Sequence, residues 1–419
     1  MNSSFSDRKT LLVIGGGIGG VTAALEAAEV GFKVVLVEKQ PFLGGRAIRM
    51  YQYFPKQCPP TCGMEINFKR IKSNPRITCY TMAEVEKIEG EPGNYMASIV
   101  LNPRYVTDKF SQGNQCLDII KSEIDDSFNL GLSKVKALYL PHDMAFPFRH
   151  VLEPDALTEE EKSKLMESCK DGEIDFDMKP EQFEVDVGAI IVATGWEPYD
   201  ANKLDNLAYG SCKNIITNVV MERLASRTGP TEGKILRPSD SKEPANVAFV
   251  QCAGSRDENH LPYCSAVCCM ASMKQARYIR EKLPDANITI FYIDIRVIGR
   301  HEKYYYDLLE DDKVKFIKGK VGKITYDGSN HNPVLEVEDT LGGKKLSEQF
   351  DLAILATGMV PTTKDVKIPY DVKYDDYGFL DPSNVSKGIF PVGVARRPED
   401  VSRATKDATS AVLKAIQYL

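Results

Sequence analysis

Three glycines, Gly15, Gly17 and Gly20, constrain the fold of this chain more than any other feature of its sequence. They follow an apolar strand expected over residues 10–14 and open a helix expected over residues 21–30. Glycines at this spacing allow a tight turn, close approach of the backbone to a pyrophosphate and close packing of the helix on the strand. The amino end of the helix stabilises the anion. The pattern therefore predicts a βαβ unit that binds a dinucleotide.

The features that follow this unit favour FAD as the dinucleotide. The next strand ends on Glu38, which we expect to accept hydrogen bonds from the adenosine ribose. Strands that end in Ala-Thr-Gly, at 193–195 and 356–358, and the segment 388–393 are usual in flavoproteins with two dinucleotide-binding domains. Val394 stands where many such enzymes carry an aspartate, so the usual carboxylate contact to the ribityl chain is absent or replaced. The predicted flavin-binding residues are Gly15, Gly17, Gly19, Gly20, Glu38, Lys39, Gly45, Arg46, Val85, Ala193, Thr194, Gly195, Thr357, Gly358, Gly393 and Val394.

A second strand–loop–helix–strand unit carries four cysteines where a nicotinamide-binding glycine loop is expected. The strand VAFVQ leads into Cys252, and Cys264, Cys268 and Cys269 come before the helical stretch MASMKQARYIREKL. Cys264 and Cys268 are four residues apart, so we expect them on one face of a helix whose amino end favours thiolates. Single-electron transfer is therefore favoured over hydride transfer from NAD(P)H.

The spacing of these cysteines leaves three interpretations open. Four thiolates match the demand of a [4Fe–4S] cluster. A Cys₄ zinc site is the main rival, although its cysteines usually come as two C-x₂₋₄-C pairs. Buried or redox-active thiols are the third interpretation.

Composition narrows the class of protein. A chain of 419 residues suggests two to three domains, and a net charge of −6 argues against nucleic-acid binding. The longest apolar stretch is about half the ~20 residues of a membrane helix, and residues 1–9 do not resemble a signal peptide. Ten cysteines favour metal or redox chemistry over disulfides. These features predict a cytoplasmic location.

At this point the chain resembles a known family. The run QCAGSRD…PYCSAVCCM, with YIDIR downstream, is similar to the flavin and cluster core of heterodisulfide reductase A subunits. The run YFPKQCPPTCGMEINFKRIKSNPRI resembles, more narrowly, the A subunit of the quinone-interacting membrane-bound oxidoreductase complex of sulfate reducers. The resemblance covers most of the chain. It implies one FAD and one [4Fe–4S] cluster whose ligands are Cys252, Cys264, Cys268 and Cys269.

The resemblance also implies a function and partners. The expected function is that of an electron-transfer subunit of an oxidoreductase complex that links the menaquinone pool to adenylylsulfate reductase in dissimilatory sulfate respiration. The implied partners are a flavin and iron–sulfur B subunit and a membrane haem C subunit, which would hold this chain on the inner face of the membrane. The alternatives are a pyridine-nucleotide disulfide oxidoreductase, a non-catalytic scaffold and an archaeal-type, electron-bifurcating heterodisulfide reductase subunit. No residue is identified as a catalytic acid or base.

The chain departs from its larger relatives in one segment. Those proteins carry ferredoxin-like cysteine strings after residues 102–106 and before residues 172–176, where this chain retains only Cys116 and Cys169. We therefore expect an insertion that keeps a ferredoxin-like shape without iron. Cys58 and Cys62 flank Pro-Pro-Thr, and two packed thiols in a Pro-rich loop are favoured over a redox pair or ligands shared with a partner.

The expected fold class is α/β, a thioredoxin-reductase-like flavoprotein with two dinucleotide-binding domains of Rossmann-type three-layer units. The Ala-Thr-Gly turns on either side of the second unit predict that one domain is inserted into the other. A Gly/Pro/Ser-rich stretch, residues 228–244, is expected to be a linker. The expected parts are an FAD domain of residues 1–101, 185–227 and 350–419, an inserted subdomain of residues 102–184, and a second nucleotide-fold domain of residues 228–349 that carries the cysteines.

Overall fold

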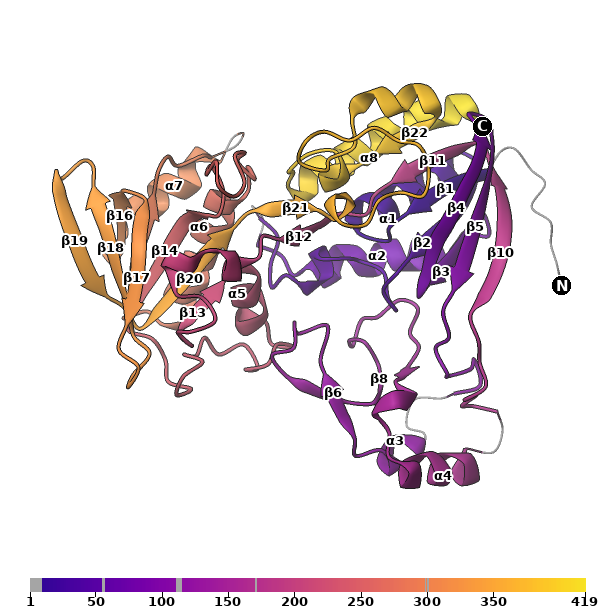
Figure 1. Cartoon of the computed structure of the whole chain (residues 1–419), viewed down its shortest axis with the longest axis horizontal. Coiled ribbons are helices and arrows are strands. Elements are labelled where there is room, and N and C mark those ends of the chain that lie inside the picture. Colours follow the sequence, from indigo (N-terminus) through magenta and orange to yellow (C-terminus); the bar gives the residue numbers. More distant parts are fainter. Residues whose placement is uncertain (1–9, 55–56, 111–114, 170–171, 298, 300) are drawn as a thin grey trace.

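The computed structural model describes residues 10–54, 57–110, 115–169, 172–297, 299 and 301–419. The polar stretch 1–9, in which the sequence predicts no signal peptide, lies outside these residues. None of the described helices combines the length and the apolar character that crossing a membrane requires. Figure 1 shows two large lobes side by side and a smaller third lobe.

The first domain is built on a five-stranded parallel sheet of order β22-β11-β1-β2-β3. Its strands are β1 (Thr10–Ile14), β2 (Lys33–Glu38), β3 (Ile77–Thr81), β11 (Ala189–Val192) and β22 (Ile389–Pro391). Both faces of this sheet are covered, which explains why the central strands are almost continuously apolar.

Different layers cover the two faces of the first sheet. The helices α1 (Ile18–Glu29), α2 (Pro60–Ser73) and α8 (Val401–Ala415) pack on one face through a core that contains Leu11 and Val13. A three-stranded antiparallel sheet packs on the other face, around Leu12 and Val35. Its strands are β4 (Ala83–Glu91), β5 (Asn94–Leu101) and β10 (Glu181–Val187).

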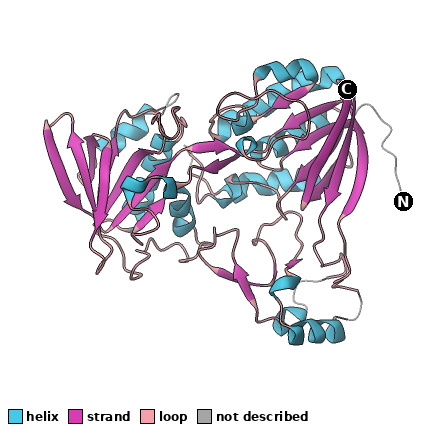
Figure 2. Cartoon of the chain, in the orientation of Figure 1, coloured by secondary structure: helices cyan, strands magenta, loops and turns pink. Residues whose placement is uncertain are grey.

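The second domain repeats this three-layer plan, as Figure 2 shows in its helices and strands. Its five-stranded parallel sheet has the order β13-β20-β14-β15-β16. The strands are β13 (Ile215–Thr217), β14 (Asn246–Ala253), β15 (Asn287–Tyr292), β16 (Val314–Lys318) and β20 (Leu352–Thr357). One face carries the helices α5 (Asn218–Ala225), α6 (Cys268–Lys282) and α7 (Glu302–Leu309). The other face carries the antiparallel strands β17 (Val321–Tyr326), β18 (Pro333–Asp339) and β19 (Lys344–Gln349).

The chain crosses between the two domains at other positions than the predicted boundaries at residues 228 and 350. A two-stranded antiparallel ribbon of β12 (Trp196–Pro198) and β21 (Met359–Pro361) connects the lobes. Strands β13 and β20 pair within the second sheet, although the sequence places them in the first domain. The strand–Ala-Thr-Gly pattern of β20 repeats that of β11, and only hydrogen-bond pairing distinguishes the two. The stretch 228–244 is accordingly a loop inside the second domain, between α5 and β14.

The segment between β5 and β10 forms the third lobe. It contains short strand pairs and two helices around a small core that includes Ile120, Leu138 and Leu165. A disulfide joins Cys116 and Cys169. The elements are α3 (Cys116–Ile119), β6 (Glu123–Asp125), β7 (Lys134–Lys136), β8 (Leu138–Tyr139), β9 (Val151–Leu152) and α4 (Glu159–Ser168).

Candidate flavin and cluster site

A cavity of about 860 Å³ lies between the first and second domains. Its wall combines the β1–α1 turn and the end of β2 with α6 and the end of β20. All predicted flavin-binding residues except Gly20 and Gly358 line it. The cavity falls within the range of 300–1,000 Å³ typical of ligand sites. The long-range packing thus assembles nearly the whole predicted residue set on one surface, and contact of each residue with a bound flavin stays a prediction.

The β1–α1 turn is shaped to receive an anion. Gly15 has φ +103°, and a Cβ there would lie 2.4 Å from the Ala193 carbonyl oxygen. Gly17 precedes the first turn of α1, and a Cβ there would meet only the Gly45 Cα, at 3.9 Å. Among the described residues no side chain caps this helix end. The amino end of α1 is therefore open toward the cavity, where backbone N–H groups and the helix dipole favour a phosphate.

Gly20 and Gly358 serve packing instead of lining the cavity. A Cβ on Gly20 would lie 1.8 Å from the Gly15 carbonyl oxygen, so only glycine lets α1 approach the turn. A Cβ on Gly358 would lie 2.2 Å from the Ser255 hydroxyl oxygen. Their predicted role in the flavin site is thus indirect, through the position of the backbone around them.

Glu38 lies at the carboxyl end of β2, with a side chain held by the backbone. Its Oε2 accepts a hydrogen bond from the Gly16 N–H at 2.5 Å, and its Oε1 accepts one from the Gln40 N–H at 2.7 Å. Burial raises the pKa of this carboxyl, while the backbone hydrogen bonds act in the opposite direction. The carboxylate is fixed beside the glycine turn, which is where a ribose acceptor is required.

Five buried polar atoms in the cavity wall have no hydrogen-bond partner among the described residues. They are Arg49 Nε, Tyr53 Oη, Thr194 Oγ1, Gln275 Oε1 and Glu399 Oε2. Buried polar atoms are normally paired, so this wall is suited to a ligand that carries many polar groups. FAD, with its phosphates, ribose and ribityl hydroxyls, fits this requirement.

Sequence reasoning missed Arg49, Tyr53 and Glu399. No spacing signal distinguishes the first two from other loop residues. Glu399 follows Gly393 closely along the chain, and it brings a carboxylate into the wall where Val394 offers none. This carboxylate is a candidate replacement for the missing aspartate.

Arg46 and Lys39, both predicted near the flavin, lie in different surroundings. Arg46 donates from Nε to the Trp196 carbonyl oxygen at 2.5 Å, pairs with Glu197 and stacks its guanidinium over the Trp196 ring at 4.9 Å. Burial lowers the pKa of Arg46 to about 10, which leaves it protonated at neutral pH. Lys39 is exposed at the rim and pairs with Glu84 at 3.2 Å.

The four cysteines of the second unit come from three different pieces of backbone. Cys252 is the last residue but one of β14, Cys264 lies in the following loop, and Cys268 and Cys269 begin α6. The prediction that Cys264 shares a helical face with Cys268 is wrong, because Ala266 has φ +61° and the helix starts only afterwards. Among the described residues no side chain caps α6, so its amino end faces the thiols with positive potential.

Three of these thiols are buried, Cys264 is partly exposed, and the sulfur atoms influence one another. Burial and the neighbouring Cys269 raise the pKa of Cys252 to about 11. Burial first, and then the other three sulfur atoms, raise the pKa of Cys268. The raised pKa makes Cys252, Cys268 and Cys269 poor acids on their own, and a metal centre that replaces their protons relieves this cost.

The separation of the sulfur atoms favours a cluster over a single zinc ion. A tetrahedral zinc with Zn–S near 2.3 Å needs sulfur atoms roughly 3.8 Å apart. Within the described ranges, Cys116, Cys169 and Glu173 are the only group of three or more ligand atoms that all lie within 4.8 Å of one another. No three of the four described cysteine sulfur atoms meet this limit, as expected where each thiolate binds a different iron.

The cysteine group adjoins the cavity wall. Cys268 Sγ lies 3.6 Å from the Thr357 carbonyl oxygen, and Thr357 lines the cavity. Val267 and Met270, on either side of the two adjacent cysteines, also line it. Electrons therefore have a short path between the cavity and the thiols.

Cys58 and Cys62 lie elsewhere. Both are exposed, so the prediction of two packed thiols is wrong. Helix α2 buries Met64, Phe68 and Ile71 on one face, which leaves Cys62 on the solvent side.

Comparison with known proteins agrees with this geometry. Residues 10–54 match a family model described as FAD dependent oxidoreductase. The chain is 36% identical to an iron-sulfur A subunit of the CoB–CoM heterodisulfide reductase of Methanopyrus kandleri, over 97% of this chain and 64% of that protein. It is 34% identical to the A subunit of the ferredoxin/F420H2-dependent CoB–CoM heterodisulfide reductase of Methanosarcina acetivorans, over 98% of this chain and 53% of that protein. The chain thus spans less than two thirds of these curated relatives.

Solved structures confirm the predicted fold class. Thioredoxin reductases from T. acidophilum and Lactococcus lactis match with TM-scores of 0.53 and 0.54, each over 98% of both chains. At 13% and 14% identity these likenesses concern the fold alone. The predicted class of oxidoreductase and the choice of FAD as its dinucleotide agree with the family model and with the reductase relatives.

Proposed function

We propose that the chain is an electron-transfer subunit of the heterodisulfide reductase type, with one FAD and one [4Fe–4S] cluster, because it is homologous over nearly its whole length to the A subunits of those enzymes. One observation carries the proposal: four cysteines, three of them buried, adjoin the wall of a dinucleotide cavity, at the turn where a nicotinamide-binding glycine loop would lie. The proposal extends to the particular reaction of the longer relatives and to their partner subunits.

The two cofactors and the residues that would hold them have different roles. FAD exchanges electrons in pairs or singly and a [4Fe–4S] cluster exchanges one at a time, so the two together connect both kinds of electron carrier. The amino end of α1 and Glu38 would hold the pyrophosphate and the ribose. Val267 and Met270, which flank Cys268 and Cys269 in the sequence, add apolar side chains to the cavity wall. No side chain of the site is assigned a proton-transfer role.

A second candidate is the A subunit of the quinone-interacting membrane-bound complex of sulfate reducers. Its support is that Cys116 and Cys169, the two cysteines left where the larger relatives carry ferredoxin-like strings, are bonded to each other. In this case the partners would be a flavin and iron–sulfur B subunit and a membrane haem C subunit on the inner face of the membrane. Adenylylsulfate reductase would be the redox partner.

Anaerobic purification tests the cofactors. We expect about one FAD and about four irons with matching sulfide per chain, and an electron paramagnetic resonance signal after reduction. NAD(P)H should leave the flavin of the isolated chain oxidised, whereas rapid bleaching would support a pyridine-nucleotide disulfide oxidoreductase. Zinc without sulfide, or a colourless protein, would contradict the proposal.

Isolation of the intact complex separates the two candidates. The chain would be purified from its native cells in mild detergent, and its companions identified by mass spectrometry and visible spectra. A co-purifying haem protein favours the quinone-interacting complex. Companions that reduce a heterodisulfide, without haem, favour the heterodisulfide reductase type.

A further inference from the structure

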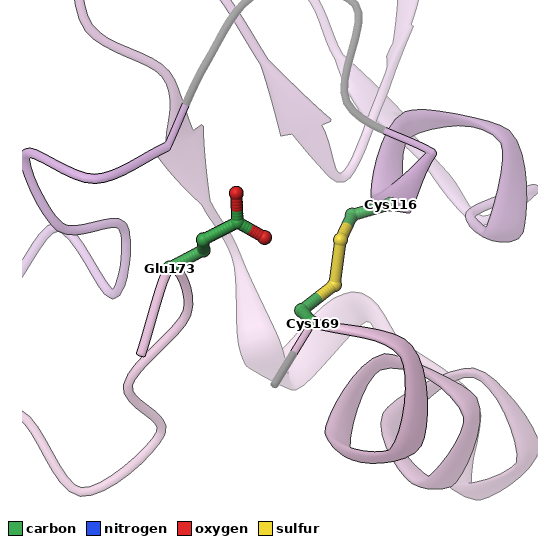
Figure 3. A group of neighbouring side chains, drawn as sticks. All are labelled: Cys116, Cys169 and Glu173. Carbon is green, nitrogen blue, oxygen red and sulfur yellow. A yellow bond between two sulfur atoms is a disulfide. The ribbon is translucent and has the colours of Figure 1, made fainter. Parts of the chain in front are cut away.

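The inserted lobe contains a second group of metal-ligating side chains, independent of the flavin and the four cysteines of the proposed function. Cys116 begins α3, Cys169 follows the last residue of α4, and Glu173 comes shortly after it. Their ligand atoms all lie within 4.8 Å of one another. Figure 3 shows the Glu173 side chain extending toward the Cys116–Cys169 disulfide. We propose that these residues form a redox-gated site for a divalent cation of the zinc class, closed by the disulfide and opened by its reduction.

The donor set selects the cation. Two thiolates are soft ligands that zinc prefers over calcium or magnesium, and a carboxylate is a common additional ligand. Three protein ligands leave a fourth tetrahedral position for water. Cys169 lies at the carboxyl end of α4, whose partial negative charge attracts a cation.

Glu173 adds a carboxylate to the two sulfur atoms. A disulfide has no proton to donate to this carboxylate, whereas a cation bound after reduction would contact all three groups at once. The oxidised geometry therefore already contains the ligands of the reduced state.

The surroundings of the site favour a cross-link in either state. Cys116 is fully buried and Cys169 is 7% exposed, within the small apolar core of the insert. So small a core gains little from apolar burial, and small units of this kind usually need a disulfide or a metal. A dithiol supplies the two electrons and two protons that convert the disulfide to two thiols, and becomes a disulfide itself. The cation then displaces the two thiol protons into water.

Metal binding tests the proposal on the full chain loaded with FAD and its cluster, so that the other four cysteines are occupied. The protein is treated anaerobically with a dithiol, freed of it and titrated with Zn²⁺ or with Co²⁺ as a visible probe. We expect one additional ion per chain after reduction and none in the oxidised protein. Binding should be lost in Cys169→Ser and weakened in Glu173→Gln by at least the 10–100-fold that loss of an outer-shell partner costs. Cys62→Ser, an exposed cysteine outside the group, is the matched control and should bind normally.

Alkylation of the wild-type protein keeps the test independent of variant folding. In the reduced chain, Zn²⁺ should slow the modification of Cys116 and Cys169, read peptide by peptide in a mass spectrometer, and leave that of Cys62 unchanged. The proposal is overturned if reduced wild type takes up no additional ion, if Cys169→Ser binds it equally well, or if Zn²⁺ protects neither cysteine.

Discussion

At the scale of single residues, the glycines of the first turn serve two different purposes. Gly17 leaves open space at the amino end of α1, where a phosphate is expected. Gly20 allows two pieces of backbone to touch, since its missing Cβ would lie 1.8 Å from the Gly15 carbonyl oxygen. A side chain at position 20 would therefore displace the backbone of the β1–α1 turn, and ligand binding would be lost as a consequence.

The first prediction concerns this difference. Gly20→Ala should lower the free energy of unfolding by several kcal/mol and abolish flavin retention, because a backbone clash cannot relax as a side-chain clash can. Gly63→Ala is the matched control: it lies in α2 with nothing within 4 Å of the added Cβ, and should stabilise by about 0.5–1 kcal/mol. Denaturant titration and flavin content measure both effects, and equal behaviour of the two variants would refute this assignment.

His142 attaches the insert to the first domain as a neutral ring. It stacks on Phe128 with ring centroids 4.5 Å apart and meets Phe42 edge-on at 4.8 Å. Its Nδ1 accepts a hydrogen bond from the Met144 N–H at 3.2 Å, which requires that this nitrogen carry no proton. Burial, and then the charges of Arg223 and Arg49, lower the pKa of His142 to about 4.

The second prediction follows from this lowered pKa. Between pH about 6.5 and about 4 the unfolded chain binds a proton at His142 that the folded chain does not, so the free energy of unfolding falls as the pH falls through this window. The loss from this residue is at most about 3 kcal/mol. His142→Phe keeps the aromatic contact and removes the titration, so its unfolding free energy should depend less on pH. Identical slopes for wild type and variant in denaturant titrations at several pH values would count against it.

At the scale of elements, the start of α6 determines which thiols meet. The helix begins with Cys268 and Cys269, while the strand β14 and the loop supply Cys252 and Cys264. The uncapped helix end favours thiolates, and burial opposes them. Because burial makes free thiolates costly, a metal centre bound to them would stabilise the second domain.

The third prediction concerns this centre. Cys269→Ser should lower the iron content from about four per chain to near zero, with flavin content preserved because Cys269 does not line the cavity. Cys212→Ser is the control, since Cys212 is a buried cysteine of the same domain whose thiol donates to the His331 carbonyl oxygen at 3.1 Å. Iron and flavin assays on anaerobically purified proteins decide the matter. Full iron content in Cys269→Ser would exclude this residue as a ligand.

At the scale of the whole molecule, a buried ion pair of the second domain contacts the backbone of the first domain. Lys274 of α6 lies 2.8 Å from Glu222 of α5, and their side chains are 4% and 9% exposed. Lys274 also donates to the Gln52 carbonyl oxygen at 2.8 Å, and Glu222 accepts from the Tyr51 N–H at 3.1 Å. Both charges therefore bind the first domain to the second beside the cavity that they line.

The fourth prediction tests this connection. Lys274→Met leaves the Glu222 carboxylate buried without its partner and should cost about 3–5 kcal/mol, and the double variant Lys274→Met with Glu222→Gln should recover part of the loss. Lys303→Met removes an exposed pair with Asp307 and should change stability by less than about 1 kcal/mol. Denaturant titration compares the three variants. A cost no larger for Lys274→Met than for Lys303→Met would show that the pair does not hold the domains.

Local sequence patterns were sufficient for part of this molecule. The glycine spacing at 15–20 and the strand before it predicted the β1–α1 turn, and the cysteine run predicted where β14 ends and α6 lies. Such patterns depend on backbone geometry over a few residues, which the sequence specifies directly. These patterns did not predict where α6 starts. Ala266 adopts a left-handed backbone conformation, so the helix begins after it and Cys264 lies in the loop.

The sequence by itself thus determined the two βαβ units, the α/β class and most of the residues that line the cavity between the domains. Only the tertiary structure decided that β20 belongs to the second sheet, that Arg49 and Glu399 face the cavity, and that Cys116 meets Cys169 across a separation of 53 residues. The physical reason is the range of the interactions. Turns and helices arise from interactions between residues that are close in the sequence. Strand pairing and contacts between side chains that are distant in the sequence depend on how whole layers pack.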